Sequence, residues 1–145
     1  MWPRWKYFEK EVGTFFGGKR HIRINRAEST GDLDGVLSYS VECKYGKQVP
    51  GYLAVACPTE LTVGDICYRL VPSKYAKVVD GTLTYDVLGW RTLARPNAKF
   101  LEDALEQAAS YQTEQQLPLV CVKIPHEHGF NLIWEDYDGR CRDKN

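Results

Sequence analysis

Residues 31–47 read GDLDGVLSYSVECKYGK, and most of what can be inferred about the fold begins from this stretch. Side chains alternate along a β-strand, so Ser40, Glu42 and Lys44 are predicted to share one face of a strand. The opposite face would carry an ordinary core set, Tyr39, Val41, Cys43 and Tyr45. Charged side chains seldom lie in the middle of a buried sheet unless they are paired or bound to a metal. The pattern therefore favours either a functional site or an edge strand that carries a cross-strand salt bridge.

Two aspartates precede this strand. Residues 32–37 and 38–45 are predicted to be two short strands joined by a turn, with Asp32 and Asp34 on one face of the first. If the two strands pair, one aspartate approaches the glutamate and lysine of the second. Mg²⁺ binds one or two carboxylates together with water and substrate phosphate, and a neighbouring lysine can orient that water or stabilise developing charge. The stretch thus indicates metal-assisted chemistry on a phosphate, with Asp32 and Asp34 as rival ligands.

Apolar periodicity predicts two helices. The first spans residues 4–16, with an inner stripe of Trp5, Phe8, Val12, Phe15 and Phe16, and ends at Gly17 and Gly18. The second spans residues 98–116, with an inner stripe of Phe100, Leu101, Ala104, Leu105, Ala108 and Tyr111.

The remaining apolar runs predict strands. They lie at residues 19–26, where Ile22 and Ile24 alternate with basic residues, and at residues 117–124 and 130–136. Residues 46–99, punctuated by proline and glycine, indicate several short strands or hairpins. The order of elements predicts one α/β domain over residues 1–145, with a mixed sheet of about five strands flanked by helices. Segment 46–99 would be a β-rich insertion within it.

Composition and charge exclude several classes of protein. No apolar run approaches the ~20 residues that a membrane span needs, and charges interrupt the N-terminal stretch, which argues against a signal peptide. Five cysteines without CxxC spacing disfavour a disulfide scaffold or a cysteine zinc site. We therefore expect a cytoplasmic protein. The formal net charge is zero, but residues 1–28 carry seven Lys or Arg and three Glu, a local excess that can contact phosphates.

Short motifs resemble the PD-(D/E)xK nuclease superfamily, above all the Holliday junction resolvases of the archaeal type and their phage-encoded relatives. FEKEV at 8–12 is similar to their first-helix motif, STGD at 29–32 to their metal-binding loop, VECK at 41–44 to the signature strand and LEQA at 105–108 to the helix that follows. The resemblance implies that Asp32, Glu42 and Glu9 bind the metal. It also implies that Lys44 completes the catalytic set and that Gln107 points back toward the site.

This resemblance implies further properties of the chain. The fold would contain a restriction-endonuclease-like core, and the cofactor would be Mg²⁺, with Mn²⁺ as a substitute. The substrate would be DNA, above all a branched four-way junction, cut by a homodimer in the cytoplasm, including that of a host if the protein is phage-encoded. The apolar residues expected at the dimer surface are Tyr52, Leu53, Tyr68, Leu70, Tyr85, Leu88 and Trp90.

Several residues admit two interpretations. The candidates for DNA contact are Arg20, Arg23, Arg26, Ser29, Thr30 and Gln107. The arginines could instead pair with surface acids, the hydroxyls could cap a turn, and Gln107 could be an ordinary surface residue. Glu9 is either a metal contact or a glutamate at the margin of the helical stripe. Two alternative functions also stand: a non-catalytic DNA-binding or assembly protein on the same fold, and a restriction-type nuclease.

Overall fold

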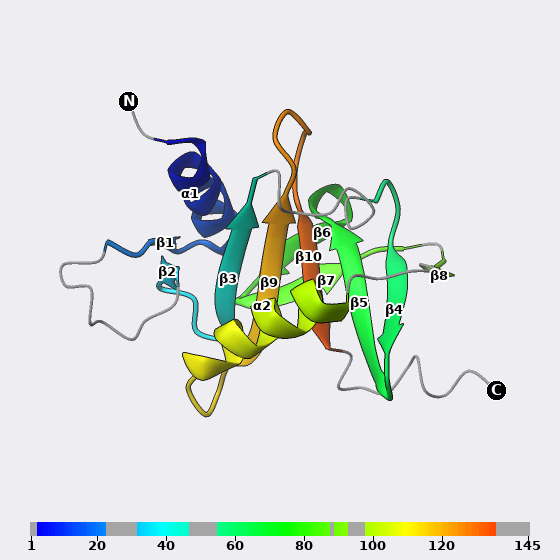
Figure 1. Cartoon of the computed structure of the whole chain (residues 1–145). Helices are drawn as coiled ribbons and strands as arrows, with labels where there is room; N and C mark the ends of the chain where they lie inside the picture. Colours follow the sequence, from blue (N-terminus) through cyan, green and yellow to red (C-terminus); the bar gives the residue numbers. More distant parts are fainter. Residues whose placement is uncertain (1–2, 23–31, 47–54, 88, 93–97, 136–145) are drawn as a thin grey trace.

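The centre of the fold is a mixed six-stranded sheet, seen in a computed structural model that describes residues 3–22, 32–46, 55–87, 89–92 and 98–135 (Figure 1). In spatial order its strands are β3 (Tyr39–Tyr45), β9 (Leu117–Lys123), β10 (Asn131–Glu135), β5 (Ile66–Pro72), β4 (Thr59–Val63) and β8 (Arg91–Thr92). The pairs β3–β9 and β4–β8 are parallel, and the other neighbours are antiparallel. The prediction of a mixed sheet flanked by helices is confirmed, with six strands where about five were expected.

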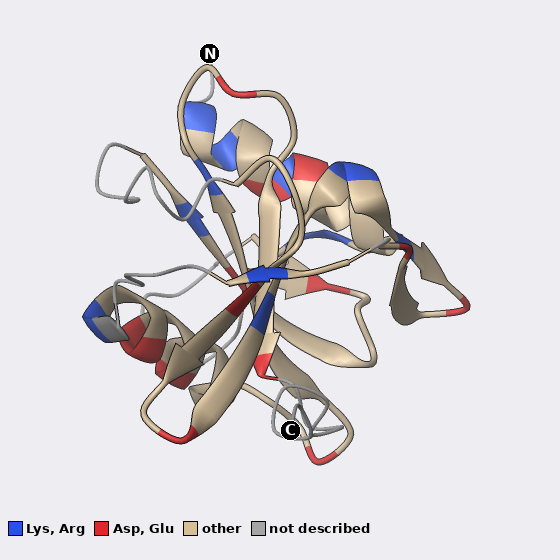
Figure 2. Ribbon diagram, turned by 90° about the vertical axis from the view of Figure 1, so that its right-hand side faces the viewer, with Lys and Arg blue, Asp and Glu red and all other residues tan. Residues whose placement is uncertain are grey.

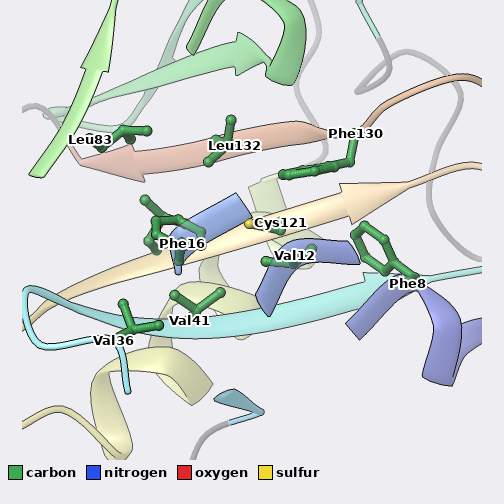
Figure 3. Packing of buried hydrophobic residues seen from close by; sticks show 10 residues of the cluster. Phe8, Val12, Phe16, Val36, Val41, Leu83, Cys121, Phe130 and Leu132 are labelled. Carbon is green, nitrogen blue, oxygen red and sulfur yellow. The ribbon is translucent and has the colours of Figure 1, made fainter. Parts of the chain in front are cut away.

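The two faces of the sheet carry different layers. Helix α2 (Ala98–Ser110) packs on one face, where it contributes to a core with Val120, Val122 and Ile133. Helix α1 (Arg4–Phe16) and the hairpin of β6 (Ala76–Val79) and β7 (Thr82–Tyr85) lie against the other. Figure 3 shows that second core, in which side chains from α1 meet those of the central strands and the hairpin: Phe8, Val12, Phe16, Val41, Leu83, Cys121, Phe130 and Leu132. A short 3₁₀ turn, η2 (Ser73–Tyr75), connects β5 to the hairpin.

Helix α1 has the predicted bounds, and its end is set by glycine. Gly17 adopts the left-handed conformation, with φ of 75°, and the N–H groups of Gly17 and Gly18 donate to the carbonyls of Thr14 and Gly13. This arrangement satisfies carbonyls that the helix would otherwise leave without partners. One member of the predicted stripe does not belong to the core, because Trp5 is 45% exposed.

Helix α2 is shorter than predicted, ending at Ser110 rather than at residue 116. The chain must turn between this helix and β9, which begins at Leu117. The amide of Gln116 donates to the carbonyl of Val36, and the N–H of Leu117 donates to the carbonyl of Ser38. These tertiary hydrogen bonds outweigh the helical propensity of the intervening residues, which is a weak preference.

Segment 46–99 supplies half of the central sheet. It is β-rich, as predicted, but β5 lies directly beside β10 and extends the sheet with β4 and β8. Within the described part of this segment, the β6–β7 hairpin forms a separate two-stranded sheet. As a consequence the expected dimer surface is wrong for two of its residues, because Tyr68 is 5% exposed and Leu70 is fully buried. Tyr52, Leu53 and Leu88 lie outside the described residues.

Strand β2 (Leu33–Asp34) does not pair with β3, contrary to the prediction of a hairpin over residues 32–45. It pairs with β1 (Lys19–Arg20). Of the strand predicted at 19–26, His21 and Ile22 are not in a strand, and residues 23–26 lie outside the described residues. Gly18 makes this pairing possible, because a Cβ atom there would lie 2.3 Å from the carbonyl oxygen of Asp34. Ile22 is 70% exposed and does not face a core as the alternation suggested.

Two further expectations concern the whole chain. Cys43, Cys57 and Cys121 are free thiols, whereas Cys67 is disulfide-bonded. The cysteine spacing disfavoured a disulfide scaffold, and Cys67 is the exception among these four residues. Among the described residues, no helix combines the length and the apolar character needed to cross a membrane.

Candidate active site

The candidate site is built on the edge strand β3. Ser40, Glu42 and Lys44 lie on the face toward α2, and Val41 lies on the face toward α1, as the alternation predicted. Ser40 Oγ donates to the carbonyl of Ala108 at 2.6 Å, which ties the strand to α2. Glu42 is 4% exposed. A carboxylate this deep requires a compensating group.

Lys44 provides that compensation. Its Nζ lies 3.3 Å from Glu42 Oε1 and donates to Gln107 Oε1 at 2.6 Å. Gln107 therefore faces the site from α2, which is the site-facing alternative of the two that the sequence left open. The ammonium is held between a carboxylate and an amide, so its position is defined on both sides. This geometry leaves Lys44 partly exposed, with 30% of its side chain accessible.

Asp32 is fixed against the free edge of β3 by two hydrogen bonds. Its N–H donates to the carbonyl of Val41 at 3.4 Å, and its Oδ2 accepts from the N–H of Cys43 at 2.8 Å. These are the residues on either side of Glu42. The approach of an aspartate to Glu42 was predicted through a β2–β3 hairpin, but the structure achieves it by this clamp on the backbone instead.

The rival aspartate has a different environment. Asp34 lies on β2, where its Oδ1 is 2.8 Å from His21 Nδ1. Asp34 does not line the cavity that contains Asp32 and Glu42. The geometry thus favours Asp32 over Asp34 as the partner of Glu42.

Glu9 approaches the site from α1. Its Oε1 accepts from Arg20 Nε at 2.8 Å, in an ion pair between helix α1 and strand β1. Both residues line the same cavity as Asp32 and Glu42. Glu9 is therefore not a solvent-exposed residue at the margin of the helical stripe. It lies on a different element from Glu42 but lines the same cavity.

Glu9, Arg20, Asp32, Glu42 and Gln107 all line one cavity of about 840 Å³. Its walls come from α1, β1, β3, α2 and the segment before β2: Trp5, Lys6, Glu9, Arg20, His21, Ile22, Asp32, Glu42, Cys43 and Gln107. The two helices near it differ in charge, because α1 carries both signs and α2 is mainly acidic (Figure 2). The cavity combines carboxylates with cations in one place.

Cys43 is the cysteine in this cavity, and it does not suit nucleophilic catalysis. Burial raises the pKa of its thiol well above the ordinary value, and neighbouring Cys121, Asp32, Glu9 and Glu42 raise that pKa further. The thiol is therefore protonated at neutral pH, whereas the thiolate is the nucleophilic form. The carboxylates that line this cavity are therefore better suited to chemistry than its thiol.

The donor set fits a hard divalent cation with incomplete protein ligation. Among the residues that the structure describes, no three His, Cys, Asp or Glu side chains form a group that could hold a metal by themselves. Mg²⁺ does not need such a cage, because it retains several waters and uses one or two carboxylates together with substrate oxygens. Asp32 and Glu42 would supply those two carboxylates.

The residues predicted from the sequence and the residues that line the cavity overlap only in part. Trp5, Lys6 and Ile22 line the cavity but were not among the candidates; Trp5 could have been found from its position one helical turn before Glu9. Four predicted DNA-contact residues lie outside the described residues: Arg23, Arg26, Ser29 and Thr30. Arg20 lines the cavity, and its contact with DNA stays a prediction.

Loss of the Gln107 amide is expected to weaken the site without removing it. In Gln107→Leu, Lys44 loses the acceptor that holds it at 2.6 Å. One such hydrogen bond contributes about 1 kcal/mol or slightly more, so any Lys44-dependent turnover should fall about tenfold. Turnover measured beside Gln112→Leu, a change at an exposed position just after α2, checks this. Equal rates in the two variants would mean that Gln107 does not position Lys44.

Comparison with known proteins adds no family assignment. No family model, no curated protein and no solved structure matches this chain.

Proposed function

We propose that this chain is a metal-dependent endonuclease that hydrolyses phosphodiester bonds in DNA. The observation that carries the proposal is the clamp of Asp32 on the backbone either side of Glu42, with Lys44 on the same strand 3.3 Å from that glutamate. Two carboxylates thus line one cavity, and the Lys44 ammonium contacts Glu42 and Gln107, which both belong to its wall. The motifs that resemble PD-(D/E)xK nucleases fall on these same residues.

In this proposal each polar group of the site has a separate role. Mg²⁺, when bound by Asp32 and Glu42, would supply positive charge to the scissile phosphate and lower the pKa of a water molecule. Lys44 would orient the attacking water or stabilise the charge that develops on the phosphate oxygens. Gln107 would keep the ammonium of Lys44 in place, because it accepts a hydrogen bond from it.

The cations of the cavity would help an anionic substrate to approach. Glu9, Asp32 and Glu42 repel a phosphate, whereas Lys6 and Arg20 line the same cavity and attract it. The ion pair of Arg20 with Glu9 fixes one of these cations near the site. Contacts by Arg23 and Arg26 remain predictions of the sequence.

Within this proposal, a Holliday junction resolvase is the favoured form. It rests on the resemblance of the motifs around Glu9, Asp32, Glu42 and Gln107. Symmetrical resolution of a junction needs two sites, so a C2 homodimer stays a prediction, although not through Tyr68 and Leu70, which belong to the core.

The proposal is tested by incubating the protein with labelled four-way junction, linear duplex and single strand, each with Mg²⁺ and with chelator. Cleavage of at least one substrate only with Mg²⁺ is expected, and Mn²⁺ should support it too. Preference for the junction would support the resolvase form, and cleavage of linear duplex at defined sequences would support the restriction-type form. Binding without cleavage under all conditions would favour the non-catalytic DNA-binding alternative.

Asp32 and Asp34 offer a matched pair of substitutions. Asp32→Asn should lower Mg²⁺-dependent cleavage about a hundredfold, because it removes a charge from the proposed metal ligand while its amide oxygen can still accept from the N–H of Cys43. Asp34→Asn should leave the rate near that of the wild type, because Asp34 contacts His21 but does not itself line the cavity. Initial rates at saturating Mg²⁺ decide the matter. If both variants lose activity equally, Asp34 also contributes to the site.

A further inference from the structure

Two exposed apolar side chains stand on the wall of an otherwise polar cavity. Trp5 is 45% exposed and Ile22 is 70% exposed, and both line the cavity that holds Asp32 and Glu42. Exposed apolar surface bordered by polar groups marks an interaction site more often than exposed apolar residues do singly. The two residues come from different elements, since Trp5 lies in the first turn of α1 and Ile22 follows β1.

Cations accompany the indole ring. Lys6 Nζ lies 5.5 Å from the centroid of the Trp5 ring, and Arg20 Cζ lies 5.8 Å from it. Both cations line the same cavity. An aromatic ring for a base and neighbouring cations for phosphates are the two elements by which proteins bind unpaired nucleic-acid strands.

The aromatic element selects for an unpaired strand. In a continuous duplex each base is stacked on both faces, so an indole at a cavity wall finds no free base to stack on. In a flap, a fork or the opened centre of a branched molecule, a base can leave the stack and present its face. Trp5 suits such a contact because its backbone lies in α1 and an aromatic side chain has few torsions to order on binding.

We infer that Trp5, supported by Ile22, stacks on an unpaired base of the DNA strand whose phosphate enters the cavity, while Lys6 and Arg20 contact the phosphates that flank it. This inference deepens the proposed nuclease function, on which it rests, by naming a specificity-determining residue and a substrate class. The substrate would be DNA with an unpaired nucleotide near the scissile phosphate.

The test measures binding without cleavage. Fluorescently labelled fork DNA and the matching full duplex are titrated with the protein in chelator, for wild type, Trp5→Leu and Trp5→Phe. Trp5→Leu should weaken fork binding about tenfold, since stacking of one base on an aromatic residue accounts for a factor of this order, and should leave duplex binding unchanged. Trp5→Phe should retain part of the fork affinity.

Tyr7→Leu is the matched control. Tyr7 is an exposed aromatic residue on the same helix, at 51%, but it lines a different cavity, with Arg4, Glu11 and Lys123. Its loss should not alter the fork-to-duplex ratio. In a second measurement, an abasic site is placed at successive positions of the single strand. At one position it should weaken fork binding by the wild type as much as Trp5→Leu does, and it should not weaken binding by Trp5→Leu further.

The outcomes separate this inference from the proposed function. Equal fork binding by wild type and Trp5→Leu, an equal loss in Tyr7→Leu, or no DNA binding by the wild type would overturn the inference. If fork binding depends on Trp5 but no DNA is cut with Mg²⁺, the nuclease proposal fails and the base-binding site stands. If DNA is cut in a Glu42-dependent way but Trp5→Leu behaves as wild type, only the inference fails. If Trp5 instead binds a protein or a membrane, an abasic site in the DNA should not change fork binding at any position.

Discussion

Replacement of Glu42 by glutamine is expected to lower Mg²⁺-dependent DNA cleavage by about a hundredfold or more. The change keeps the shape of a side chain that is 4% exposed and removes the negative charge proposed to bind the metal. The fold should persist, because Lys44 keeps Gln107 as an acceptor and is partly exposed to solvent. Single-turnover rates at saturating Mg²⁺, together with the circular dichroism spectrum, make the measurement.

Glu106→Gln is the control for this substitution. Glu106 lies on α2 next to Gln107 but is exposed, so the same chemical change there should leave cleavage unaltered. Combining Glu42→Gln with Lys44→Ala should cost much less than the sum of the two single effects, because residues that act together are not additive. Normal cleavage by Glu42→Gln would show that the proposed site is not the active site.

The second large effect concerns stability and lies far from the site. Arg69 Nη1 is 2.6 Å from Glu60 Oε1, with Arg69 at 2% and Glu60 at 6% exposure, and the guanidinium lies 4.1 Å from the ring centroid of Trp90. Arg69→Met should lower the free energy of unfolding by about 3–5 kcal/mol, because it removes the guanidinium that pairs with the buried Glu60 carboxylate. Urea denaturation at neutral pH measures this change.

Two controls interpret that loss. Lys99→Met breaks the exposed pair with Asp103 on α2 and should cost at most about 0.5 kcal/mol. The double variant with Glu60→Leu and Arg69→Met should recover much of the stability, because no charge is then left buried. Since β5 lies three strands from β3, the cleavage rate of folded protein should not change. A loss below about 1 kcal/mol in Arg69→Met would mean that water or another group compensates Glu60.

Local patterns in the sequence were sufficient for several elements. The bounds of α1, the strand β9 and the two faces of β3 follow from spacings of a few residues. These patterns depend on the geometry of one helix or one strand, so they can be inferred without knowledge of the rest of the fold. The same reasoning placed Glu42 and Lys44 side by side.

Long-range pairing was beyond such reasoning. The amphipathic pattern of α1 put Trp5 in the core, whereas the packing leaves it at a cavity wall. The composition of segment 46–99 predicted strands. It did not predict that β5 would pair with β10, which lies some sixty residues later in the chain. Hydrogen-bond partners in a sheet depend on which strands become neighbours, and nothing in a single strand encodes its neighbour.

The sequence by itself determined that a glutamate and a lysine share a strand face and that two aspartates lie shortly before them. Only the tertiary structure distinguished Asp32 from Asp34. The N–H of Cys43 points away from β9 and needs an acceptor, and Asp32 provides it. That N–H is available because β3 lies at the edge of the sheet, a position set by strands that follow it in the chain. The physical reason is that a backbone donor at a sheet edge selects its partner from whatever the whole fold brings within reach.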